Sequence, residues 1–196
     1  MNTQELQAAL ELLGMLATDP RIVVLFALLA IASVSDYRSY RIPNWLTVGG
    51  AAFALVYITA AAVSPLTAFS VALGGLLLGF AIMLPLYALR VMGAGDVKLM
   101  AMVGAFLGVY ETFQAILFAF IVGGIAAIGF ALHKRKLLRL LQNAKDVVYE
   151  MSALGMSGVR PEAHLDAHQS VGKLPFGICI SIGTAGYVLG QQFGLA

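Results

Sequence analysis

Residues 66–89 read LTAFSVALGGLLLGFAIMLPLYAL, a stretch without a single charged side chain. A transmembrane helix needs about 20 consecutive, mainly apolar residues, so this stretch predicts a membrane span. The whole chain has the same character, because 60% of its 196 residues are hydrophobic and only 11% are charged. A soluble domain carries about 25% charged residues. We therefore expect an integral membrane protein that forms one domain over residues 1–196.

Five further apolar stretches predict an all-α, polytopic fold with about six transmembrane helices. The fourth span is short, because its 13 residues fall below the ~20 that usually cross a bilayer. Such a segment is either tilted into a thin region or partly re-entrant, and protein or a water-filled cavity must then surround it. The five stretches cover residues 20–35, 44–63, 97–109, 112–132 and 176–193.

Two other segments predict amphipathic helices at the membrane surface. Residues 3–17 place Leu6, Leu10 and Leu13 on one helical face, which is typical of an interfacial helix rather than a span. Residues 133–174 form the only extended polar stretch. Its first half has leucines at helical spacing among many lysines and arginines, which indicates a basic helix on an anionic leaflet.

The positive charges predict the orientation in the membrane. If both termini are outside, 11 of the 12 lysines and arginines lie on the cytoplasmic side, including the 133–174 loop. The positive-inside rule favours that arrangement. Only Arg21 then remains outside, and the cytoplasmic set is Arg38, Arg41, Arg90, Lys98, Lys134, Arg135, Lys136, Arg139, Lys145, Arg160 and Lys173.

Two aspartates occupy unusual strings where apolar segments meet basic loops. Asp36 lies in SDYRSYRIPN, residues 35–44, and Asp96 lies in GAGDVKL, residues 93–99. A carboxylate at a membrane helix centre costs about 2.5–3.5 kcal/mol, so its presence needs a reason. The topology above places both on the cytoplasmic side. Two carboxylates that share a proton can activate water and polarise a peptide carbonyl, so the pair predicts an aspartic protease that uses water and no cofactor.

These strings resemble motifs of the type IV prepilin peptidase family. Residues 93–96 resemble its Gly-x-Gly-Asp motif, Asp36 with residues 41–44 resembles its first aspartate string, and residues 173–177 resemble its Pro-aromatic-Gly entry to the last helix. The resemblance implies cleavage of prepilin or pseudopilin leaders at the cytoplasmic face of the bacterial inner membrane. Cys179 is the single cysteine, and long family members have a tetracysteine domain. The chain therefore looks like the compact Flp/Tad-type form, without N-methyltransferase activity.

Six further residues are candidates for substrate binding or for shaping the site. Gly93 and Gly95 are expected to let the backbone pass close to the substrate. Lys98 is expected to stabilise the ionised aspartates or contact an acidic substrate residue, and a snorkelling interfacial lysine is the alternative. Capping of a helix start is the structural alternative for Asp96. The six candidates are Gly93, Gly95, Lys98, Arg41, Pro43 and Asn44.

The same residues are compatible with other functions. Another intramembrane Gly-x-Gly-Asp protease, a small transporter or proton channel using the two aspartates as a relay, and a non-catalytic assembly factor remain alternatives. His164 and His168 are four residues apart, but without a third ligand we expect no metal site. The expected partners are a prepilin helix and lipid, without nucleic acid.

The glycine pairs leave one further question open. Three pairs with GxxxG spacing suit close helix contacts, either within the chain or in a homo-oligomer. They are Gly75/Gly79, Gly104/Gly108 and Gly186/Gly190.

Overall fold

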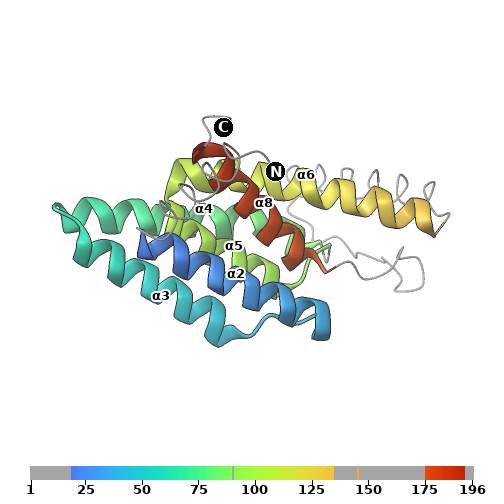
Figure 1. Ribbon diagram of the computed structural model, residues 1–196, viewed down its shortest axis with the longest axis horizontal. Helices are drawn as coiled ribbons and strands as arrows, with labels where there is room; N and C mark the ends of the chain where they lie inside the picture. The colour runs from blue at the N-terminus through green and yellow to red at the C-terminus, as the bar shows by residue number, and fades with distance from the viewer. Residues whose placement is uncertain (1–18, 90, 135–144, 146–174, 193–196) are drawn as a thin grey trace, which may run out of the picture.

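The computed structural model describes residues 19–89, 91–134, 145 and 175–192. This part of the chain contains six α-helices and no strand, which confirms the all-α prediction (Figure 1). The helices are α2 (Pro20–Ser39), α3 (Asn44–Ala61), α4 (Pro65–Ala88), α5 (Ala94–Leu107), α6 (Val109–His133) and α8 (Phe176–Gln192).

Four of these helices are long and apolar enough to cross a membrane. They are α2, α3, α4 and α6, with mean hydropathies between 1.4 and 2.6. Helix α5 has 14 residues and corresponds to the predicted short fourth segment. Helix α8 has 17 residues. The chain is therefore a polytopic membrane protein. Helix α2 continues to Ser39, four residues beyond the predicted end of the first span, so Asp36 lies inside its last turn.

Consecutive helices run in alternating directions along the bundle. In Figure 1 the end of α2 and the starts of α5 and α8 lie to the right of centre, and α3 begins below them. The α3–α4 connection lies at the opposite end. The two aspartate strings, at the end of α2 and the start of α5, therefore come to the same end of the molecule.

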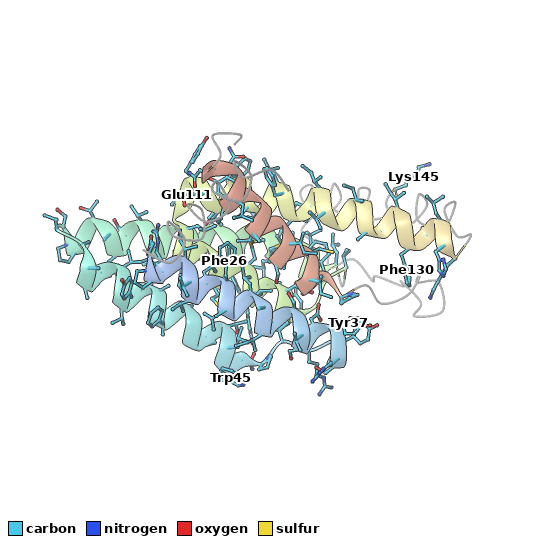
Figure 2. All side chains as sticks on the ribbon, in the orientation of Figure 1. Phe26, Tyr37, Trp45, Glu111, Phe130 and Lys145 are labelled. Atoms are coloured by element: carbon cyan, nitrogen blue, oxygen red, sulfur yellow. The ribbon has the colours of Figure 1, made fainter. Side chains whose placement is uncertain are left out.

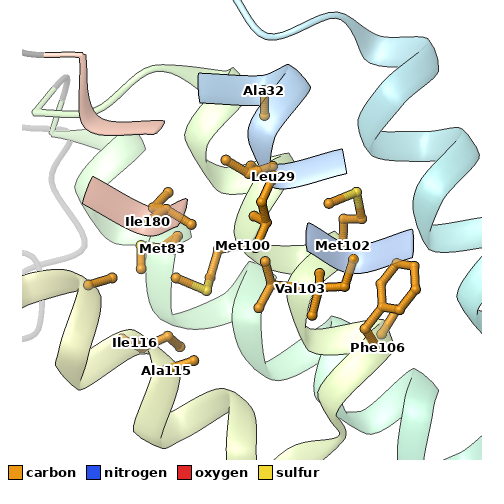
Figure 3. Close-up of a cluster of buried hydrophobic side chains, with 14 of the residues drawn as sticks. Leu29, Ala32, Met83, Met100, Met102, Val103, Phe106, Ala115, Ile116 and Ile180 are labelled. Atoms are coloured by element: carbon orange, nitrogen blue, oxygen red, sulfur yellow. The ribbon is translucent and has the colours of Figure 1, made fainter. Parts of the chain in front are cut away.

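Helix α5 is the buried centre of the bundle. It contacts α2, α3, α4, α6 and α8, and every residue from Leu99 to Phe106 is buried. Figure 3 shows its Met100 and Val103 among side chains of the surrounding helices, such as Leu29, Ile116 and Ile180. Enclosure by protein explains how a helix too short to span the bilayer is accommodated.

Glycines bring the backbones of α4 and α5 into direct contact. A Cβ atom added to Gly75 would collide with the backbone of Gly104, and one added to Gly104 would collide with that of Gly75. A Cβ on Gly79 would lie 2.6 Å from the carbonyl oxygen of Met100. Gly75, Gly79 and Gly104 therefore serve packing within the chain, which answers the question that their sequence spacing left open.

Gly108 makes the sharp turn between α5 and α6. Its φ is +87°, a conformation that side chains with a Cβ rarely adopt, and it is the C-cap of α5 and the N-cap of α6. Because one residue joins the two helices, α6 begins where α5 ends.

Several predictions fall on residues that the structure does not describe. They are the amphipathic helix over 3–17, the basic helix and loop within 135–174, and the pair His164 and His168. These remain predictions.

The α4–α5 contact gives a first testable outcome. Gly75→Ala should lower the thermal stability of the detergent-purified protein, since overpacking costs about 1–3 kcal/mol and the obstacle here is backbone. Gly124→Ala in α6 is the matched control, because its Cβ would meet nothing within 4 Å. Equal melting temperatures for the two variants would contradict the close packing of α4 on α5.

Candidate active site

A pocket of about 510 Å³ lies where α2 ends and α3 and α5 begin. The two aspartates and the six other candidates from the sequence all line it, although they come from segments about 60 residues apart. Those eight residues are Asp36, Arg41, Pro43, Asn44, Gly93, Gly95, Asp96 and Lys98. Ser35, Ser39, Tyr40, Ile42 and Ala94 complete the lining.

Asp36 links the end of α2 to the start of α8. Its side chain is only 6% exposed, and its Oδ2 accepts a hydrogen bond of 2.8 Å from the backbone N–H of Gly177. Gly177 is the second residue of α8. The N–H groups of a first helical turn lack partners within the helix and favour a negative charge. This contact offsets part of the cost of burying the carboxylate.

The chain reverses immediately after Asp36. Tyr40 adopts the left-handed conformation (φ 50°), and its N–H donates to the carbonyl of Asp36 at 2.9 Å. The hydroxyl of Ser35 donates to the carbonyl of Arg41 at 2.7 Å, which holds the returning chain against α2. Pro43 then precedes α3 in an extended conformation. This turn folds residues 41–44 back over the aspartate.

Asp96 lies in the first turn of α5. It is 9% exposed, and its Oδ2 accepts a hydrogen bond of 3.1 Å from the N–H of Gly93, the N-cap residue. The capping role considered from the sequence is therefore observed. The same carboxylate lines the pocket and is close enough to Asp36 for the two charges to repel each other when both are ionised.

Lys98 and Asn44 connect α5 to α3 at the edge of the pocket. The Lys98 ammonium donates a hydrogen bond of 2.8 Å to Oδ1 of Asn44. Among the described residues, no carboxylate lies within ion-pair distance of Lys98. An ammonium has three N–H donors, and the amide uses one of them.

Sequence reasoning did not assign site roles to Gly177 and Ile42. Gly177 belongs to the Pro-aromatic-Gly string, and Ile42 belongs to the string that follows Asp36. A clue was thus present for each, but the contact of Gly177 with Asp36 spans 141 positions and arises only in the folded chain. Among the described residues, no group of three or more His, Cys, Asp or Glu is placed to hold a metal ion.

These features define a polytopic helical membrane protein with two buried carboxylates in one pocket at the end of the bundle. A model of the type IV leader peptidase family matches residues 23–128, more than half of the chain, and the chain belongs to this family. Membership implies a peptidase rather than a transporter. Comparisons with curated proteins and with solved structures find no match. The matched region contains all eight predicted site residues, whereas α8 lies outside it.

The space beside Gly95 gives a second testable outcome. A Cβ on Gly95 would lie 3.2 Å from Cβ of Ile42, so Gly95→Val should push the start of α5 away from the returning chain. We expect strongly reduced peptidase turnover with nearly unchanged thermal stability, since small displacements of reacting groups cost up to about 100-fold. Turnover and melting temperature of the purified variant test this.

Gly49→Val is the control, because a Cβ on Gly49 would meet nothing within 4 Å. Unchanged turnover in Gly95→Val would remove any special role for this glycine. If turnover and thermal stability fell together, Gly95 would be a packing residue.

Proposed function

We propose that the protein is an aspartic endopeptidase that removes the leader peptide of type IV prepilins or pseudopilins, of the Flp/Tad type. The observation that carries the proposal is the placement of two buried carboxylates, Asp36 and Asp96, in one pocket. They belong to different helices and reach the pocket through separate helix-terminus contacts.

The chemistry requires one proton on the pair. Burial and mutual repulsion disfavour two ionised carboxylates, so the pair shares a proton. The ionised carboxyl removes a proton from water, whose oxygen attacks the carbonyl carbon of the scissile peptide. The protonated carboxyl donates to the carbonyl oxygen. The tetrahedral intermediate then breaks its C–N bond as a proton passes to the leaving nitrogen, and no cofactor takes part.

The remaining pocket residues suit an extended peptide. Gly93 and Gly95 lack side chains beside Asp96, so a substrate backbone can approach it closely. The Lys98 ammonium, oriented by Asn44, offers donors to a carboxylate or a main-chain carbonyl. Arg41 and Pro43 line the same pocket on the returning chain. We assign these residues to substrate binding and to the shape of the site.

The surroundings of the pocket favour the membrane–water interface. Tyr37 is 72% exposed and Trp45 is 68% exposed, and both protrude at the end of the bundle where α2 meets α3 (Figure 2). Tyrosine and tryptophan concentrate at the interfaces of membrane proteins, and the basic residues of the adjoining loops favour the cytoplasmic side. A pocket at the membrane–water interface lies at a depth that suits cleavage of a peptide bond just outside the bilayer, between a polar leader and an apolar helix.

Replacement of either aspartate is the direct test of mechanism. Asp36→Asn and Asp96→Asn keep size and polarity but remove the shared proton, so each should reduce leader removal at least about 100-fold. Purified variants should be incubated with candidate prepilins from the same genome and scored for the shortened product.

Asp19→Asn is the matched control, since Asp19 caps the start of α2 away from the pocket. The control should cleave normally, and all three variants should insert into the membrane. Processing at nearly the wild-type rate by either Asp36→Asn or Asp96→Asn would refute the aspartic mechanism.

The orientation is tested with two engineered cysteines. In a Cys179→Ala background, Tyr37→Cys lies at the pocket end and Val63→Cys in the exposed α3–α4 connection. A membrane-impermeant thiol reagent should label position 63 in intact cells and position 37 in inverted vesicles. The reverse pattern would place the pocket on the wrong face for cutting a cytoplasmic leader.

A further inference from the structure

The start of α8 is in direct contact with one of the two carboxylates. The N–H of Gly177 donates to Oδ2 of Asp36 at 2.8 Å, and this hydrogen bond is buried. It fixes the carboxylate from outside its own helix. The direction in which Asp36 points is therefore set by where the first turn of α8 lies.

Position 177 has no room for a side chain. A Cβ there would lie 2.8 Å from Oδ2 of Asp36 and 3.0 Å from Cδ1 of Ile42. A contact below 3.0 Å forces some atom to shift, and the atom that the new Cβ meets here is a carboxylate oxygen. Gly186, in the same helix, differs: its Cβ would meet only Cδ1 of Phe118, at 3.9 Å.

Ile42 lies between the two backbones that hold the aspartates. Its side chain is buried and approaches Gly177, which binds Asp36. Its Cβ lies beside Gly95, which directly precedes Asp96, at 3.2 Å from the position of an added Cβ. A β-branched side chain has restricted χ1 freedom, so the two branches at Cβ of Ile42 keep a nearly fixed direction between the two backbones.

We propose that Gly177 and Ile42 are positioning residues that set the separation and orientation of the Asp36 and Asp96 carboxylates. The inference rests on the aspartic mechanism proposed above. Proton sharing requires the two carboxyl groups to approach within hydrogen-bonding distance, and a displacement of about 1 Å can cost about 100-fold in rate. Neither residue needs to touch the substrate for this role.

Gly177→Ala is the principal test. We expect kcat for leader removal to fall about 100-fold with little change in KM, because the displaced group matters in the transition state and not in substrate binding. The acidic limb of the kcat–pH profile should move to higher pH, since a weaker hydrogen bond to a carboxylate disfavours its ionised form. Gly186→Ala, measured in parallel, should match the wild type in both respects.

Ile42→Val provides a second measurement that does not depend on the folding of the first variant. It removes only Cδ1, the atom that faces Gly177. We expect a several-fold lower kcat, an unchanged KM and a melting temperature close to that of the wild type. In Gly177→Ala, the added Ile42→Val change should restore part of the lost kcat, because it frees space beside the new methyl group.

The outcomes separate this inference from the proposed function. Wild-type cleavage that is lost in Asp36→Asn but retained in Gly177→Ala, at the level of Gly186→Ala, would overturn the positioning role alone. The positioning role would also be overturned if kcat and melting temperature fell together in both Gly177→Ala and Ile42→Val while the pH profile stayed unshifted. Failure of the wild type to cleave any prepilin would refute the proposed function and this inference together.

Discussion

The direct contact between the backbones of α4 and α5 is the constraint on which the rest of the molecule depends. Within a bilayer, helices gain little from the hydrophobic effect when they associate, so close van der Waals packing must hold them together. Gly75 and Gly104 allow that packing because neither has a side chain in the contact. Helix α5, too short to span the membrane, is thereby enclosed by its neighbours. Asp96, in the first turn of α5, is buried at the end of the bundle.

The two carboxylates have structural roles that are compatible with the chemistry proposed for them. Each accepts a hydrogen bond from a backbone N–H at a helix start, Asp96 within α5 and Asp36 across to α8. A negative charge at the N-terminus of a helix is favourable, which offsets part of the cost of burial in a membrane protein. Capping and catalysis are therefore compatible for these residues. These contacts fix one oxygen of each carboxylate, Oδ2, through a backbone N–H group.

The site extends beyond the part of the chain that matches the leader peptidase family. That match ends at residue 128, and it includes both aspartates and the residues around them. Helix α8 begins at Phe176, yet its first turn supplies the hydrogen bond to Asp36. The family relationship thus establishes a peptidase. The arrangement of the pair depends in addition on a helix that follows the matched region.

The sequence by itself determined the helical membrane fold, because long apolar stretches have few stable alternatives in a bilayer. It also singled out eight residues that line one pocket, because two costly carboxylates stand out against an apolar chain and the strings around them resemble family motifs. Only the tertiary structure decided that α2 continues through Asp36 to Ser39, that Gly75 and Gly104 pack within the chain, and that Gly177 and Ile42 meet the aspartates. The glycine and Ile42 contacts join distant segments at the scale of single atoms. Hydropathy and local spacing do not say which distant segments make such contacts.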